Sequence, residues 1–316
     1  MSAEIVLYSP AFEEALAGAK AFAGASKADR TIQVYRGAFD AFRAWCGTAG
    51  IAKPLPATAE ATAAYLSHLA ASGRKASTID LHVAAIACAH RAAGYETPTS
   101  CEIVRTTVKG IRRRLGTKAT RKAPATADAL KRMLRKIPDT LVGKRDRALL
   151  LIGFAAALRR SELVALHVED LERTDEGVLV HITRSKTDQE GAGHVVAVPA
   201  GSRLRPVQAL DAWLDAAAIT EGPVFRPLGK GGRVIAAALA TGSVAQIVKD
   251  RAAAAGLDPK LFSGHSLRAG FVTSALEAGA DLLKVMDVTR HREVGTLKVY
   301  DRRAQAFRNH AGKGFL

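Results

Sequence analysis

The chain has few cysteines, no long apolar stretch and a shortage of negative charge. Its three cysteines, Cys46, Cys88 and Cys101, are far apart and form no Cys-x-x-Cys pair. That spacing argues against a zinc site or a disulfide framework and suits a reducing compartment. No apolar run reaches the roughly 18 residues that a membrane-spanning helix needs, and no basic-then-apolar leader is evident. We therefore expect a cytoplasmic protein, associated with the nucleoid, that has no membrane partner.

Acidic residues are in the minority, and one long segment has none. The chain carries 46 Lys and Arg against 30 Asp and Glu, a net charge of +16, which favours a polyanionic partner such as nucleic acid. Between Ile103 and Ala127 there are eight basic residues and no acidic one. We interpret residues 117–127 as a basic linker near a nucleic-acid backbone, with a solvated charged face as the alternative. The expected contacts are Arg112, Arg113, Arg114, Lys118, Arg121 and Lys122.

The length of 316 residues suggests two domains. A helical pattern of apolar residues runs from Ser26 to about Leu115, and it predicts helices at 59–69, 77–92 and 100–115. The predicted organisation is an N-terminal segment (1–25), a helical domain (26–116), the basic linker (117–127) and a second domain (128–316).

The second domain has a mixed pattern. Thr126 is placed to cap a helix that runs to about Ile137, and an apolar helix is expected to start near Asp146 and end near Leu158. Residues 178–183 and 194–198 are rich in β-branched residues and predict a hairpin. Helices are expected from residue 205 onwards. The predicted fold class is therefore mainly α with one small β-sheet.

Two segments of the second domain place arginines where a specific role is expected. Arg159 closes the predicted apolar helix, where an unpaired charge would be costly, and Glu162, three residues on, could orient it. A helix-terminal cation favoured by the macrodipole is the ordinary alternative. His265 and Arg268 are also three residues apart, and Ser263 could cap their helix. A structural hydrogen bond is the commoner use of such a histidine.

The remaining candidates are His291, Tyr300 and Lys186. His291 precedes Tyr300 by nine residues, and Lys186 lies in the polar loop of the predicted hairpin. A phenol can act as a nucleophile, and a lysine at a loop tip can donate a proton to a departing alkoxide. A partly buried aromatic and an exposed loop lysine are the ordinary alternatives for Tyr300 and Lys186.

Each signal is weak alone, but their order along the chain is informative. The sequence resembles the tyrosine recombinases of the phage integrase family over nearly its whole length. The residues that carry this resemblance are Arg159, Lys186, the His265-x-x-Arg268 pair, His291 and Tyr300. Residues 147–150 and 157–163 are similar to the opening of the family's catalytic domain, and residues 31–36, 77–79 and 109–113 are similar to its core-binding domain. In place of the Leu-Gly-His of many members, this chain has Thr289-Arg290-His291. By the resemblance, Arg290 would add positive charge near the bound phosphate and leave the role of His291 intact.

The resemblance implies a fold, a reaction and a role for each residue. The fold would be a helical, SAM-like core-binding domain followed by a mixed α/β catalytic domain. Tyr300 would attack a backbone phosphate, while Arg159 and Arg268 bind its non-bridging oxygens and Lys186 protonates the 5′-oxygen. His265 would assist proton transfer, His291 would hydrogen-bond the phosphate, and Glu162 would support the site.

The resemblance also implies partners and the absence of cofactors. Family members act as tetramers on two inverted-repeat duplex sites and exchange strands through a Holliday junction without metal or nucleotide. Accessory DNA-bending or directionality proteins are possible additional partners. The 25 residues before the helical domain leave no room for a separate arm-binding domain, so a simple two-domain, Xer- or Cre-like layout is expected. In the family, the tail that follows the tyrosine docks on a neighbouring subunit.

Two other functions are compatible with much the same set of residues. A type IB topoisomerase has a similar set of catalytic residues but acts as a monomer that relaxes supercoils. A DNA-binding protein with a decayed site is the non-enzymatic alternative, although all six catalytic candidates are present.

Overall fold

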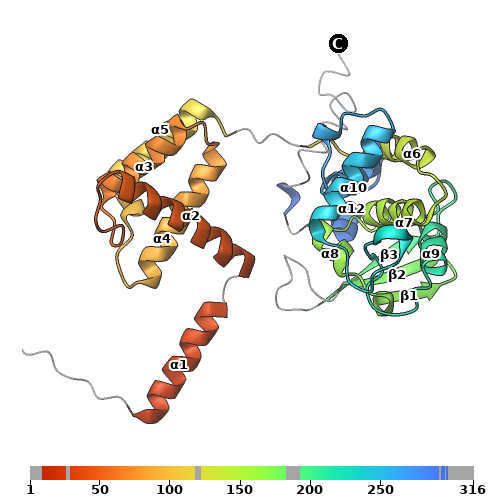
Figure 1. Ribbon diagram of the computed structural model, residues 1–316, viewed down its shortest axis with the longest axis horizontal. Coiled ribbons are helices and arrows are strands. Elements are labelled where there is room, and N and C mark those ends of the chain that lie inside the picture. Colours follow the sequence, from red (N-terminus) through yellow and green to blue (C-terminus); the bar gives the residue numbers. More distant parts are fainter. Residues whose placement is uncertain are drawn as a thin grey trace, which may run out of the picture. The chain divides into compact units, whose positions relative to one another are not determined.

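The chain forms two compact units, residues 1–120 and 121–316, each drawn in Figure 1. The computed structural model describes residues 9–25, 29–117, 122–182, 193–291, 293–295 and 297. In these residues helices dominate and three strands form one sheet, which confirms the predicted fold class.

The described part of the first unit is helical. Its α-helices are α1 (Pro10–Ala25), α2 (Asp29–Thr48), α3 (Ala59–Ala71), α4 (Ala76–Ala92) and α5 (Glu102–Leu115). The helices α3, α4 and α5 confirm the predicted ones to within about two residues at each end. The Thr58 hydroxyl caps α3 by accepting from the backbone N–H of Ala61, as expected for a threonine at that position. The core of this unit includes Phe42 and Tyr65, whose rings meet edge to face with centroids 5.1 Å apart.

The second unit combines helices with an antiparallel sheet. Its α-helices and strands are α6 (Ala127–Arg135), α7 (Leu141–Ala155), α8 (Arg160–Ala165), β1 (Leu171–Thr174), β2 (Gly177–Ile182), β3 (His194–Pro199), α9 (Pro206–Ala216), α10 (Thr241–Ala254), α11 (Ser266–Glu277) and α12 (Leu282–Thr289).

The sheet has the order β1-β2-β3, with Leu171 opposite Val180 and Val178 opposite Val198. The predicted hairpin is confirmed as β2 and β3. The first strand was not predicted because Leu171 is its only apolar residue and its remaining residues are exposed.

The long helix α7 differs from the prediction at both ends. It begins after Thr140, whose hydroxyl accepts from the Gly143 N–H, and it ends at Ala155. Asp146 lies inside the helix, where it is 3% exposed and accepts hydrogen bonds from Arg145 and Arg251. A buried carboxylate needs such partners. Asp146 therefore pairs with arginines in the folded core and does not mark the start of a helix.

Part of the expected linker packs on the second unit. The N–H of Ala123 donates to Leu261 O (2.7 Å) and that of Ala125 donates to Ser266 O (2.8 Å), and Ala125 is fully buried. Thr126 then caps α6 as predicted, by accepting from the Ala129 N–H. Residues 122–127 thereby hold the start of α11, the helix that carries Arg268.

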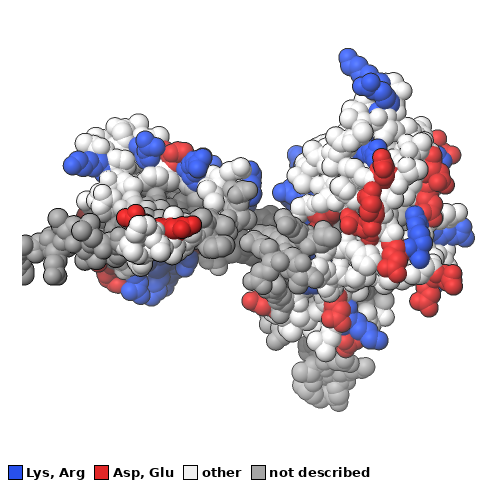
Figure 2. Space-filling model, turned by 90° about the horizontal axis from the view of Figure 1, so that it is seen from below, with Lys and Arg blue, Asp and Glu red and all other residues white. Residues whose placement is uncertain are grey.

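Charge is not spread uniformly over the described surface. On the face of the second unit seen in Figure 2, acidic side chains lie among basic ones, so this face is not uniformly positive.

None of the described helices is both long enough and apolar enough to cross a bilayer. The three cysteines are free thiols.

Candidate functional site

Arg159 lies in the short connection between α7 and α8, and not at the end of the apolar helix as predicted. The connection turns at Ala157, which has a positive φ of 47°. Glu162, in the first turn of α8, holds Arg159 twice: its Oε2 accepts from the Arg159 backbone N–H (2.8 Å) and its Oε1 from Nη1 (2.7 Å). The Glu162 side chain is 2% exposed and that of Arg159 19%. The carboxylate therefore fixes the arginine while part of its side chain stays accessible.

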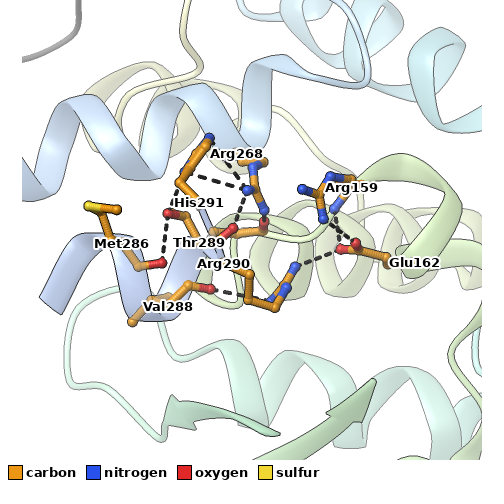
Figure 3. A network of polar contacts seen from close by, with 9 residues as sticks. Arg159, Glu162, Arg268, Met286, Val288, Thr289, Arg290 and His291 are labelled. Carbon is orange, nitrogen blue, oxygen red and sulfur yellow. Dashed lines mark hydrogen bonds and ion pairs between the residues drawn. The ribbon is translucent and has the colours of Figure 1, made fainter. Parts of the chain in front are cut away.

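Arg268, on α11, is a buried cation at 2% exposure. Its Nη1 donates to Ala157 O (2.8 Å), and its Nη2 donates to Thr289 O and lies 3.5 Å from both ring nitrogens of His291. Arg268 thus ties the turn before Arg159 to the end of α12. In Figure 3 its side chain and that of His291 lie side by side.

His265 occupies the N-cap position of α11, one turn before Arg268. Ser263 was predicted to cap this helix. Its hydroxyl instead accepts from the N–H of His265 (3.3 Å), and its own N–H donates to the hydroxyl of Ser266 (3.0 Å). This turn fixes the backbone of His265, and the residue itself is exposed.

His291 follows α12, which begins at the Asp281 cap. Its Nδ1 lies 2.6 Å from the Thr289 hydroxyl, which is also 2.6 Å from Val285 O. The hydroxyl has one hydrogen, so it either donates to Val285 O and accepts from a protonated Nδ1, or donates to Nδ1. Donation to Nδ1 would leave the ring proton on Nε2, the tautomer that can donate to a bound anion.

Both histidines have lowered pKa values. Burial, followed by the positive charges of Arg268 and Arg159, lowers the pKa of His265. Burial also lowers the pKa of His291 to about 4, with further contributions from Arg268, Arg159, His265 and Arg290. Both rings are therefore neutral near pH 7.

Arg290 also belongs to this cluster; the sequence predicted that it adds positive charge near the phosphate, but not that it pairs with Glu162. It ends α12 in the left-handed region (φ 55°, ψ 44°), and its Nη2 donates to Glu162 Oε2 (2.6 Å). One carboxylate thus binds two arginines, as Figure 3 shows. In the sequence, Arg290 stood out only because many family members have glycine at the position before this histidine.

The cluster has an excess of positive charge. Three guanidiniums (Arg159, Arg268 and Arg290) and one carboxylate (Glu162) leave a net charge of +2, with neutral imidazoles beside them. Arginine forks fixed by protein acceptors suit an anion with several oxygens. Nowhere in the described segments do three or more His, Cys, Asp or Glu residues come together in a way that could hold a metal ion.

The structure leaves other predicted residues untested. Lys186, Tyr300, Lys118 and Arg121 lie outside the described residues, so the placement of the nucleophile and the proton donor stays a prediction.

The remaining predicted DNA contacts lie on both units. Arg112 pairs with Asp80 (2.8 Å), and Arg113 and Arg114 are exposed in the last turn of α5. Lys122 donates to Lys260 O (2.6 Å) on the second unit.

Comparison with known proteins gives the family. Residues 125–306 match the phage integrase family. The integrase/recombinase xerD homolog of Selenomonas ruminantium is 39% identical over 292 residues, which cover 90% of this chain and 85% of that protein.

Solved structures of low identity share the fold. A lambda integrase tetramer bound to a Holliday junction matches with a TM-score of 0.61 at 18% identity, over 90% of this chain and 75% of that one. The XerH recombinase in a post-cleavage complex with palindromic difH matches with a TM-score of 0.61 at 19% identity, over 82% and 72%. Because the family match covers more than half of the chain and the xerD homolog aligns with most of it, this chain belongs to the phage integrase family of tyrosine recombinases.

Proposed function

We propose that this chain is a site-specific recombinase that cleaves and rejoins DNA strands through a 3′-phosphotyrosine and a Holliday junction. ATP would not be needed, because the phosphotyrosine ester keeps the energy of the broken bond. The arginines would take the place of a metal ion in stabilising the charge on the phosphate oxygens. The observation that carries the proposal is the convergence of Arg159, Arg268 and His291 from three separate segments onto one positively charged site.

The described groups suit phosphoryl transfer. As a phosphate is attacked, negative charge grows on its non-bridging oxygens, and donors already aimed at that charge lower the barrier. Arg159 and Arg268 are held in place by protein acceptors of Glu162, Ala157 and Thr289. Little reorganisation is then required during the reaction.

The remaining steps fall to residues outside the described segments. Tyr300 would attack the phosphorus, its oxygen forming the new ester as the 5′-oxygen leaves, and Lys186 would supply the proton for that oxygen. Attack by a second 5′-hydroxyl on the phosphotyrosine would reverse the step and release Tyr300. His265, neutral near pH 7, would assist proton transfer by accepting the proton that the Tyr300 phenol loses.

The assemblies seen in structures with the same fold support the proposed assembly of this chain. One neighbour is a lambda integrase tetramer on a Holliday junction, and another is XerH bound to a palindromic site after cleavage. By analogy, we propose a homotetramer on two duplex sites with inverted repeats. The exposed basic residues Arg113 and Arg114 are proposed phosphate contacts in the first unit.

Covalent trapping on a pool of nicked duplexes tests the reaction and its specificity. Half of the pool would be random in sequence and half taken from the DNA that flanks the gene. DNA that stays attached after denaturation would be sequenced, with Tyr300→Phe as the control. Wild-type adducts through a 3′-phosphate, enriched in an inverted repeat, are expected. Adducts without sequence preference would indicate a type IB topoisomerase, and tight binding without adducts would indicate a DNA-binding protein.

A further inference from the structure

Arg290 has a backbone conformation that arginine rarely adopts. It lies at the C-cap of α12 with a φ of 55°, a region in which a side chain crowds the backbone and glycine is the usual residue. A non-glycine residue held in this conformation beside a functional site suggests that its side chain has a role there.

The side chain of Arg290 is almost completely buried. It is 7% exposed, and its Nη2 lies 2.6 Å from Glu162 Oε2. Its Nη1 donates to Val288 O (3.3 Å), while its buried Nε has no hydrogen-bond partner in the described part of the chain. Burying an incompletely satisfied guanidinium is unfavourable. Packing alone would be served better by an apolar residue.

The partner of Arg290 is the carboxylate that orients Arg159. Glu162 Oε1 accepts from Arg159 Nη1 (2.7 Å), and Oε2 accepts from both the Arg159 N–H and Arg290 Nη2. A carboxylate paired with Arg159 alone would cancel most of the charge that Arg159 needs for an anion. A second guanidinium on the same carboxylate offsets its charge and leaves that of Arg159 available.

We propose that Arg290 is a positioning residue that neutralises Glu162 and ties the segment carrying His291 to Arg159. This inference rests on the proposed function, because the anion that Arg159 serves is taken to be the scissile phosphate. Arg290 acts through Glu162 and does not touch the substrate.

The test compares Arg290→Gly with a matched control. Arg205→Gly makes the same change at an exposed arginine that also has a positive φ, 49°, at the start of α9 and outside the site. We expect Arg290→Gly to slow adduct formation about tenfold to a hundredfold, a range typical of small losses of alignment. DNA affinity should change less than about twofold, because phosphate contacts elsewhere supply most of it. Arg205→Gly should leave both quantities unchanged.

Two further variants separate positioning from a general structural effect. Arg290→Lys keeps the charge and should recover part of the lost rate, whereas Arg290→Met keeps the bulk without the charge and should not. In a double-mutant cycle, adding Arg290→Gly to the Glu162→Gln variant should not slow adduct formation any further. The carboxylate charge that Arg290 offsets is already absent from that variant. The proposal would be overturned if Arg290→Gly formed adducts at the wild-type rate. It would also be overturned if Arg290→Gly slowed adduct formation as much in the Glu162→Gln variant as in the wild type. If Arg290→Gly does not fold, equal rates for the Lys and Met variants would overturn it.

Failure of the proposed function would be distinguishable. Wild-type protein that forms no adduct would contradict strand cleavage, and binding of inorganic vanadate, measured calorimetrically, would then test Arg290 alone. Weaker vanadate binding by Arg290→Met than by Arg290→Lys would support the inference, and equal binding would overturn it.

Discussion

At the scale of single residues, the site depends on cations that the protein holds in place. Arg268 is buried and donates to two backbone carbonyls, of Ala157 and Thr289, that belong to segments more than 100 residues apart. Its planar fork can make these contacts and still face an anion, which a single ammonium cannot do. The identity of this residue therefore matters as much as its charge.

Replacing Arg268 with lysine tests that requirement. Arg268→Lys keeps the positive charge but loses the fork, so cleavage should slow by roughly 10²–10³, as when one oriented donor is removed from an oxyanion site. DNA affinity should be nearly unchanged in a binding assay run beside the adduct assay. Arg173→Lys, at an exposed ion pair with Asp211, is the control. Equal cleavage rates for Arg268→Lys and wild type would contradict a role for the fork.

The lowered pKa of His291 predicts how stability depends on pH. The folded ring has a pKa of about 4, whereas an unfolded histidine titrates near 6.5. Between these values the unfolded chain binds the proton and the folded chain does not, so stability is lost as pH falls from about 6.5 towards 4. The charged groups that hold the pKa down are Arg268, Arg159 and Arg290, with His265 beside them.

Titration of the ring by NMR measures this shift directly, with His291→Gln to assign the signal. We expect a midpoint near 4 and a shallower dependence of stability on pH in His291→Gln. His167→Gln, at an exposed histidine, is the control for the loss of an imidazole. A His291 midpoint near 6.5 would rule out the buried, cation-flanked environment.

At the scale of elements, the close approach of α11 to residues 122–127 positions the site. A Cβ at Gly270 would lie 1.9 Å from Ala125 O, a backbone atom that cannot easily move. Gly270 is two residues from Arg268 on the same helix, so any displacement there is passed to the arginine.

Gly270→Ala should therefore displace α11, with a stability loss of about 1–3 kcal/mol as in other overpacked sites, together with slower cleavage. Gly242→Ala, on α10, meets nothing within 4 Å and should be neutral or stabilising because alanine favours a helix. Denaturant unfolding of both variants measures the difference. A Gly270→Ala protein as stable as wild type would show that the contact has room to relax.

Local patterns in the sequence predicted most elements but not the contacts between them. The Thr126 cap and the hairpin of β2 and β3 follow from short-range signals, and both are confirmed. The predicted start of α7 near Asp146 was wrong because the partner of this aspartate, Arg251, is 105 residues away and was not apparent from local sequence. The pairing of Glu162 with Arg159 is local and was expected, whereas that of Glu162 with Arg290 spans 128 residues and was not.

At the scale of the whole molecule, assembly is proposed to depend on the segment after Tyr300. Deleting residues 311–316 should weaken tetramer formation more than DNA binding, because such a tail would pack its apolar Phe315 and Leu316 on another subunit. Gel shifts would report binding, and sedimentation on a synthetic Holliday junction would report assembly. Unchanged junction complexes from the truncated protein would contradict this role.

Mass spectrometry of the trapped adduct tests most directly whether Tyr300 becomes linked to DNA. Nuclease and trypsin digestion would leave the peptide 299–302 with any nucleotide attached to Tyr300. We predict a nucleotide joined through its 3′-phosphate to the Tyr300 oxygen, and unmodified peptide from Tyr300→Phe incubated in the same way. A nucleotide on another residue, a 5′-phosphate linkage, or an adduct that persists in Tyr300→Phe would contradict this prediction.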